Sequence, residues 1–208
     1  MPLYKTLTVN ENTKALIWKI EESFEELSVG IQLTKNSTDR VSSMKSEIHR
    51  RGFLSVRHLL KEVGYADDDL VYDEFGKPHL KNGKHISITH SFTFSALIVS
   101  DNKPVGIDIE KQRDKIVKIA HKFTPIEEYN TIANHEALVS KLTIVWGAKE
   151  SLYKIYGKKQ LRFLENIYVE DFSFENDNTT AEIRYDGETF GYDVHFLEID
   201  GFTCVYAF

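Results

Sequence analysis

The sequence predicts an α+β fold made of two similar halves, residues 1–104 and 105–208. The chain has 208 residues, of which 41% are hydrophobic and 12% aromatic, so it can bury a core and does not have the composition of a disordered chain. Strand-like and helical segments come in blocks rather than in strict alternation, which is typical of α+β proteins. No Gly/Ser-rich or proline-rich linker separates the halves, and we therefore expect them to pack tightly.

In the first half, short apolar and partly alternating runs predict strands, at Leu3–Val9, Ala15–Ile20, His85–Phe92 and Phe94–Ser100. Apolar residues at helical spacing predict one long helix over Val41–Val63, ended by Gly64. The segment Ala66–Asp69 has the composition of a polar loop, and Phe75-Gly76-Lys77-Pro78 that of a turn.

The second half begins with a predicted strand, Val105–Glu110, and continues with about fifty residues of helical character. The expected helices are Ile116–Phe123, one that begins at Thr124-Pro125, and Ala137–Tyr156, which ends at Gly157. The remaining residues predict β-hairpins, with turns at Asp186-Gly187 and Asp200-Gly201.

Charge is distributed unevenly along the chain. The net charge is −6, which argues against non-specific binding to nucleic acid. Residues 111–162 are rich in lysine, whereas Arg184 is the one basic residue in the segment 163–208. The lysine-rich region suits a phosphorylated ligand or an acidic partner, or else it forms a solvated helix face.

Several protein classes lack support in the sequence. No apolar run approaches the ~20 residues of a membrane span, and the N-terminus lacks the pattern of a signal peptide. Cys204 is the single cysteine, which excludes an intrachain disulfide. We expect a cytoplasmic globular protein that does not bind membranes.

The segment Gly106–Glu110 contains the first candidate site. Alternation along a strand places Asp108 and Glu110 on one face. Two carboxylates on one face repel each other unless a cation lies between them, and a hard divalent ion such as Mg²⁺ meets that need. Taken alone, this pattern is more often the acidic solvent face of an edge strand.

The second candidate lies in the predicted helix Ala137–Tyr156. Trp146, Glu150 and Lys154 follow one another at intervals of four residues and share a helix face. Taken alone, a glutamate and a lysine at this spacing are more often an exposed pair. With Lys149, the lysines around Glu150 also suit a phosphate site.

The third candidate is His90, between Thr89 and Ser91 at the end of a predicted strand. A histidine flanked by hydroxyl groups can donate hydrogen bonds to phosphate oxygens, although a lone histidine is more often structural. The sequence contains no Walker A loop, no Gly-x-Gly-x-x-Gly and no Gly-x-Ser-x-Gly, so nucleotide hydrolases, Rossmann dehydrogenases and α/β-hydrolases have no support.

Together these segments resemble the Sfp type of the 4′-phosphopantetheinyl transferase family. The resemblance runs from about Arg51 to Phe163 and depends on four motifs in order: Gly76-Lys77-Pro78, Thr89-His90-Ser91, Gly106-Ile107-Asp108-Ile109-Glu110 and Trp146-x-x-Lys149-Glu150-x-x-x-Lys154. It implies a pseudo-twofold pair of α+β halves with the active site at their junction. The N-terminal half would form the coenzyme A side and the C-terminal half would carry the metal and the catalytic helix.

The resemblance also implies an activity, the transfer of the 4′-phosphopantetheine arm of coenzyme A to a serine of an apo acyl or peptidyl carrier protein. The by-product is adenosine 3′,5′-bisphosphate. Asp108, Glu110 and Glu150 correspond to ligands of Mg²⁺, and Mn²⁺ accepts the same oxygen ligands. Glu150 is the first candidate to accept the serine proton, and Lys154 would contact the pyrophosphate. We expect Asp108 and Glu150 to be exposed, so that removing either carboxylate leaves the fold intact.

Further residues are implied on the coenzyme A side. His90 and Thr89 correspond to residues that bind the 3′-phosphate, while Lys77 and Pro78 would line the adenine pocket. Arg51 and Arg57 both lie near the position of a phosphate-binding arginine of the family. Arg57 is the preferred one, because it precedes the apolar pair Leu59-Leu60 in a run that resembles the family's. Glu127 resembles another acidic position near the site, and a helix first-turn acid is an equal alternative.

Two other functions remain open. The chain could be a catalytically silent module that binds coenzyme A or a carrier protein, or a metal-dependent phosphodiesterase. The four residues Asp108, Glu110, Glu150 and Lys154 argue against the silent module, because binding alone does not need all of them.

The expected partners follow from the same resemblance. A monomer is the simpler expectation, since two halves make one complete site. An acidic carrier helix would fit Lys115, Lys118 and Lys122.

Overall fold

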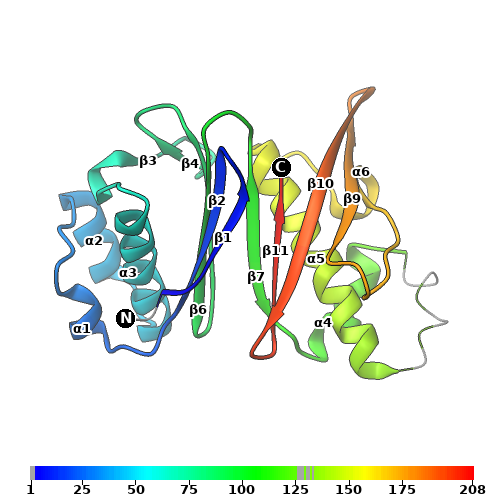
Figure 1. Cartoon of the computed structure of the whole chain (residues 1–208), viewed down its shortest axis with the longest axis horizontal. Coiled ribbons are helices and arrows are strands. Elements are labelled where there is room, and N and C mark those ends of the chain that lie inside the picture. Colours follow the sequence, from blue (N-terminus) through cyan, green and yellow to red (C-terminus); the bar gives the residue numbers. More distant parts are fainter. Residues whose placement is uncertain (1–2, 126–128, 130–131, 133) are drawn as a thin grey trace. The chain divides into compact units, whose positions relative to one another are not determined.

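In the computed structural model, the chain divides into two compact units, Met1–Pro104 and Val105–Phe208 (Figure 1). The structure describes residues 3–125, 129, 132 and 134–208. Each unit packs helices against its own antiparallel sheet, so the predicted α+β class is confirmed. Within the described part of the chain, no helix is both long and apolar enough to cross a membrane.

The first unit contains a four-stranded sheet in the order β1-β2-β6-β5. Its strands are β1 (Leu3–Asn10), β2 (Thr13–Lys19), β5 (His85–Ser91) and β6 (Phe94–Ser100). The two strands β5 and β6 form a tight hairpin, in which His90 pairs with Ser95 and Ser91 with Phe94. The strand predictions for this half were close to these bounds.

The helices of this unit are α1 (Phe24–Ser28), α2 (Lys35–Ser43) and α3 (Glu47–Glu62). The prediction of one helix over Val41–Val63 was wrong, because the backbone becomes extended at Met44 and Ser46. The serines around this break offer the backbone alternatives to helical hydrogen bonds, and such residues favour helix ends.

Helix α3 covers the sheet through a buried apolar face that includes Leu54, Leu59 and Leu60, packed with Leu16 and Leu97 of the strands. The chain then passes through a 3₁₀ turn, η1 (Asp67–Asp69), where we had expected a loop. A small ribbon follows, made of β3 (Leu70–Tyr72) and β4 (Pro78–Leu80). Gly76 has a φ of +86° in the predicted turn between these strands.

The second unit contains a five-stranded sheet in the order β7-β11-β10-β9-β8. Its strands are β7 (Gly106–Lys111), β8 (Ile167–Val169), β9 (Asn178–Tyr185), β10 (Glu188–Ile199) and β11 (Phe202–Ala207). The predicted Asp-Gly turns join β9 to β10 and β10 to β11, and both residues of each turn have positive φ, as type I′ hairpins require.

Its helices are α4 (Lys115–Ile119), the 3₁₀ turn η2 (Ala120–Lys122), α5 (His135–Tyr156) and α6 (Phe163–Asn166). The helix expected to begin at Thr124-Pro125 falls largely on residues outside the described part. Helix α5 begins after Asn134, whose side chain accepts hydrogen bonds from two backbone N–H groups, and ends at Gly157 with a φ of +75°.

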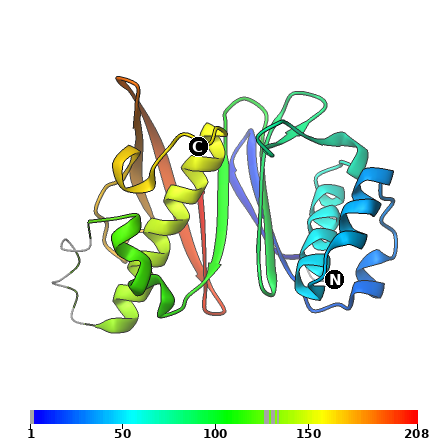
Figure 2. The same ribbon diagram turned by 180° about the vertical axis from the view of Figure 1, so that it is seen from behind.

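Helix α5 lies across one face of the second sheet (Figure 2). Two glycines allow this close packing. A β-carbon at Gly106 of β7 would lie 2.0 Å from the Ser151 carbonyl oxygen, and one at Gly147 of α5 would lie 2.6 Å from Val205 Cγ2. The sheet therefore holds the Glu150–Lys154 turn of α5 directly over β7.

Candidate active site

The second unit brings together four of the predicted residues. Asp108 and Glu110 alternate with the buried Ile107 and Ile109 along β7, which pairs with β11 on one side. Lys154 of α5 reaches this strand. Its Nζ atom donates hydrogen bonds of 2.8 Å to Asp108 Oδ1 and of 2.8 Å to the Ile107 carbonyl oxygen.

The expectation that Asp108 is an exposed carboxylate was wrong, because this residue is only 5% exposed. Packing of α5 on β7 covers it, and the Lys154 ammonium group compensates its charge. Removing the carboxylate therefore affects the packing of the unit as well as its chemistry.

Glu150 lies one helical turn before Lys154 and has a pKa raised to about 7. Burial of its carboxyl group is the largest cause, and the negative charges of Asp108 and Glu110 raise the pKa further, while Lys154 lowers it. The four side chains thus form one electrostatically coupled group, which we call the carboxylate cluster: Asp108, Glu110, Glu150 and Lys154.

The three acidic members of this cluster suit a hard divalent cation, because their ligand atoms are all carboxylate oxygens. A cation would also relieve the repulsion that raises the pKa of Glu150. Among the described residues, however, no group of three Asp, Glu, His or Cys side chains is close enough together in this structure to hold a metal ion. The ammonium group of Lys154 provides the positive charge beside Asp108 instead.

Lys149, by contrast, does not belong to the cluster. Its side chain is buried, and Nζ donates to the carbonyl oxygens of Phe163 and Ile167. It fixes α6 and the start of β8 to α5. Of the two lysines considered for a phosphate site around Glu150, only Lys154 lies at the carboxylate cluster.

In the first unit, His90 lies against the first half of α3. A β-carbon at Gly52 would come within 3.1 Å of His90 Cγ, and the rings of His49 and His90 are 5.9 Å apart. Arg51, beside Gly52, donates a hydrogen bond of 3.2 Å from Nη2 to the Ile20 carbonyl oxygen.

The region around His90 has the features of an anion site. The N-terminus of α3 carries partial positive charge, and Ser46 makes no side-chain cap there. His49 was not singled out from the sequence, because it lies on a helix and His90 on a strand, with no motif that connects them. We refer to His49, Arg51 and His90 as the basic corner.

Arg57 has a different environment from the one we expected. It is 4% exposed, and its Nε atom lies 2.9 Å from Asp67 Oδ1 in a buried ion pair. Its guanidinium group also stacks over the Phe53 ring at 3.5 Å. These contacts occupy the side chain inside the unit, so the structure does not support our preference for Arg57 over Arg51.

Asp67 accepts several hydrogen bonds in addition to the one from Arg57. Burial alone would raise its pKa, but the pKa is lowered because the Thr34 N–H, the Ser37 hydroxyl group and Arg57 all stabilise the carboxylate. The network joins α2, α3 and η1 and has the character of a structural core element.

The remaining predicted residues are more scattered. Lys77 lies in the turn before β4, where its backbone N–H donates to Asp73 Oδ1, and burial lowers the pKa of its side chain. Pro78 begins β4. Thr89 is buried, whereas its neighbour His90 is exposed, as expected for successive residues of a strand. Glu127 lies outside the described residues.

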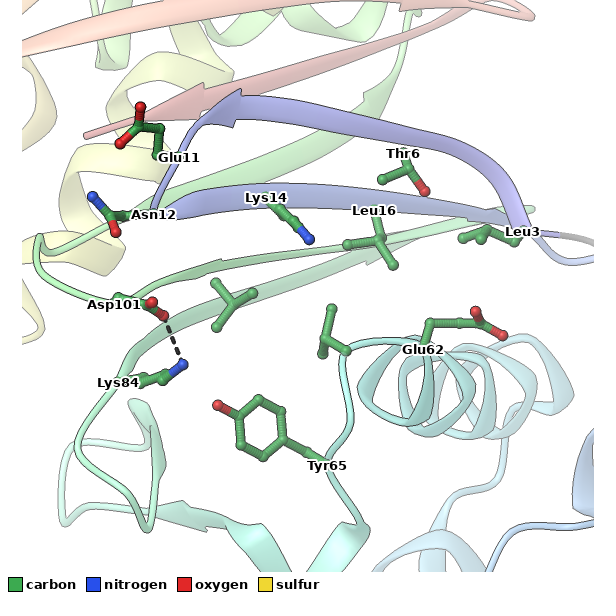
Figure 3. Close-up of a pocket in the computed structure, with 12 residues that line it drawn as sticks. Leu3, Thr6, Glu11, Asn12, Lys14, Leu16, Glu62, Tyr65, Lys84 and Asp101 are labelled. Carbon is green, nitrogen blue, oxygen red and sulfur yellow. Dashed lines mark ion pairs between the residues drawn. The ribbon is translucent and has the colours of Figure 1, made fainter.

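The first unit also contains a pocket of about 400 Å³ near the C-terminal end of α3, whose walls include Leu16, Glu62 and Tyr65. Figure 3 shows it, with the Lys84–Asp101 ion pair at its edge, 2.8 Å between Nζ and Oδ1. None of the predicted site residues lines it, because the basic corner lies at the opposite end of α3. A smaller pocket of about 130 Å³ adjoins Glu110 and Trp146 in the second unit.

Comparison with known proteins agrees with the resemblance seen in the motifs. The sequence profile of the 4′-phosphopantetheinyl transferase superfamily matches residues 104–207, half of the chain. The chain belongs to this superfamily.

Curated relatives support the Sfp type. The chain is 31% identical over 134 residues to the 4′-phosphopantetheinyl transferase gsp of Aneurinibacillus migulanus, covering 62% of this chain and 53% of that protein. It is 28% identical over 123 residues to the transferase Sfp of Bacillus subtilis (strain 168), covering 55% and 54%. The chain thus matches about half the length of these relatives.

Proposed function

We propose that this protein transfers the 4′-phosphopantetheine arm of coenzyme A to a serine of an apo carrier protein and releases adenosine 3′,5′-bisphosphate. The observation that carries the proposal is the carboxylate cluster, in which Asp108, Glu110 and Lys154 act electrostatically on Glu150 inside the region matched by the family profile. Such a cluster suits the transfer of a phosphoryl-linked group, since that chemistry depends on positioning and on charge stabilisation.

Asp108, Glu110 and Glu150 would hold Mg²⁺, or Mn²⁺ in its place. A bound divalent cation would offset negative charge on the pyrophosphate. The Lys154 ammonium group would contact the same pyrophosphate and stabilise the leaving bisphosphate. Lys154 now pairs with Asp108, so it is already positioned at the edge of the cluster.

Glu150 would accept the proton of the attacking serine. A general base must be unprotonated before it accepts a proton, and a cation at the cluster would favour that form of Glu150 by lowering the pKa that burial raises to about 7. The carboxyl group lies on α5, a regular helix that packs on β7, and a rigid element of this kind suits the positioning that proton transfer requires.

The N-terminal unit would provide the coenzyme A side. His90 and Arg51 of the basic corner would bind the 3′-phosphate, with partial positive charge from the start of α3. Thr89 would belong to the same phosphate site, and Lys77 and Pro78 would line the adenine pocket. Arg57 is left out of this set, because its buried ion pair with Asp67 gives it a structural role.

The carrier protein would approach the lysine-rich surface of α4 and η2, where Lys115 also lines the small pocket beside Glu110. An acidic carrier helix would complement this charge. Replacing Lys115, Lys118 and Lys122 by Gln should raise the KM for the carrier and leave the affinity for coenzyme A unchanged. Equal losses for both substrates would contradict this docking surface.

The test of the proposed function follows adenosine 3′,5′-bisphosphate by chromatography, with coenzyme A and Mg²⁺, in the presence and absence of an apo carrier. Transfer predicts bisphosphate only when the carrier is present, and none after addition of a chelator. Cleavage of coenzyme A without a carrier would indicate a phosphodiesterase. Saturable coenzyme A binding without any product would indicate a silent binding module.

A further inference from the structure

Helix α3 contains a buried glycine in its interior, Gly52. Glycine is less favourable than alanine inside a helix, because it loses more backbone entropy on folding. The packing of His90 explains why a glycine is present. A β-carbon at position 52 would lie 3.1 Å from His90 Cγ, 3.3 Å from Nδ1 and 3.4 Å from Cδ2, so the imidazole ring packs on the helix where a side chain is missing.

A pair of buried serines joins the same part of α3 to the sheet. Ser55 Oγ, one helical turn after Gly52, is hydrogen-bonded to the Gly52 carbonyl oxygen at 2.9 Å and to Ser95 Oγ of β6 at 2.8 Å. Both serines are fully buried. Hydrogen bonds between buried hydroxyl groups depend on distance and direction, so they define the position of a helix more narrowly than apolar contacts do.

The register of the β5–β6 hairpin connects these two observations. Ser95 is the cross-strand partner of His90, and residues directly opposite each other have their side chains on the same face of a sheet. Gly52 therefore packs against the His90 ring, and one turn later Ser55 binds the residue opposite that histidine. Arg51 lies on the same turn of α3, beside Gly52.

We infer that Gly52, Ser55 and Ser95 are positioning residues for the proposed 3′-phosphate site. They set the separation between the helix that carries Arg51 and the strand that carries His90. Gly52 has no side chain and both serines are buried, so they act through the exposed His90 and not on the ligand. This inference rests on the proposed function. Binding sites of this kind need their donors held within about 0.5 Å of the productive geometry.

The test compares the binding of coenzyme A with that of 3′-dephospho-coenzyme A, which lacks only the 3′-phosphate, by calorimetry. The ratio of the two Kd values measures the phosphate site alone. In Gly52→Ala the added methyl group displaces the His90 ring by a few tenths of an ångström. We expect the preference for coenzyme A to fall about 3- to 30-fold, because a charge-assisted hydrogen bond is weakened, and the Kd for dephospho-coenzyme A to stay unchanged. Ser95→Ala should lower the preference too.

A second background separates positioning from a general effect on the fold. If Gly52 acts through His90, then Gly52→Ala should not change the ratio further in a His90→Ala protein. An equal fall with and without His90 would overturn the inference. Gly191→Ala is the matched control, since a β-carbon at that position has no neighbour within 4 Å in the described part of the chain, and its ratio should equal that of the wild type.

The remaining outcomes distinguish this inference from the proposed function. A wild-type ratio in Gly52→Ala, or in Ser95→Ala, would overturn the inference and leave the proposed function intact. A wild-type protein that modifies a carrier but binds both ligands equally would have no 3′-phosphate site at His90, and the inference alone would fail. If the wild type bound neither ligand, the proposed function itself would fail, and this inference with it.

Discussion

Lys154 and Asp108 form the ion pair around which the candidate site is built, with 2.8 Å between Nζ and Oδ1. The pair joins α5 to β7, and the same lysine also binds the Ile107 carbonyl oxygen. A buried carboxylate, a second acid of raised pKa and a partly exposed ammonium group therefore share one small region of the second unit.

Replacement of Asp108 by Asn should abolish carrier modification, to below about 1% of the wild-type rate, because the cluster loses a charged oxygen donor. It should also lower the free energy of unfolding by about 1–2 kcal/mol, since Lys154 loses its charged partner in a partly buried place. Urea unfolding and a carrier-loading assay measure the two effects. Asp171→Asn, which removes the exposed partner of Lys141, serves as the control and should retain activity. Near-normal turnover in Asp108→Asn would contradict the assignment of the cluster.

Gly147→Ala should destabilise the second unit by roughly 1–3 kcal/mol, although alanine is the better helix former, because the added methyl group meets Val205. The shift of α5 away from the sheet should also separate Glu150 and Lys154 from Asp108 and reduce activity. Thermal unfolding and kcat are the measurements. Gly191→Ala provides the matched control, since a β-carbon at that strand position has no neighbour within 4 Å among the described residues. A fully stable, fully active Gly147→Ala protein would show that the close packing is not needed.

Replacing Arg51 and replacing Arg57, both on α3, should have different effects. Arg57→Met should lower the free energy of unfolding by about 3–5 kcal/mol, because Asp67 is left as an uncompensated buried charge. Arg51→Ala should cost about 1 kcal/mol of stability, for one lost hydrogen bond, and should raise the Kd for coenzyme A more than tenfold. Calorimetric binding at a temperature where both variants are folded distinguishes the roles. Weaker coenzyme A binding by a folded Arg57→Met protein, with normal binding by Arg51→Ala, would reverse the assignment.

Stability should depend on pH through Asp67. The pKa of this carboxyl group is lower in the folded protein than in the unfolded chain, so its contribution is present at pH values above the unfolded pKa, about 3.9, and is lost as the pH falls through the folded pKa. The stability difference between the wild type and Asp67→Asn should therefore be largest at neutral pH and shrink below about pH 4. Urea unfolding between pH 3 and 7 measures it. Asp68→Asn, which breaks the exposed pair with Lys81, should change stability by less than about 1 kcal/mol throughout. A difference independent of pH would argue against an ionised Asp67 in the folded state.

The sequence allowed prediction of the features that depend on local chemistry. The hairpin turns followed from their Asp-Gly pairs, and the end of α5 followed from Gly157. The grouping of Asp108 with Glu110 followed from the alternation of a strand. Each of these inferences needs only neighbouring residues.

Features that depend on distant contacts were not predictable in this way. The partner of Arg57 lies ten residues away, beyond the end of α3, and nothing in the local pattern indicates that Asp67 would be buried beside it. The burial of Asp108 depends on α5, which follows β7 by more than twenty residues in the chain. The positive φ of Phe92, +51° in the turn between β5 and β6, depends on the register of that hairpin, which composition does not reveal.

The most direct test of the central claim is the intact mass of an apo carrier protein after incubation with this protein, coenzyme A and Mg²⁺, with Glu150→Gln in parallel. We predict that the carrier gains the mass of one phosphopantetheine, that a chelator prevents the gain, and that Glu150→Gln produces little or none. An unchanged carrier mass across acyl and peptidyl carriers, from wild-type protein that binds coenzyme A, would contradict the account.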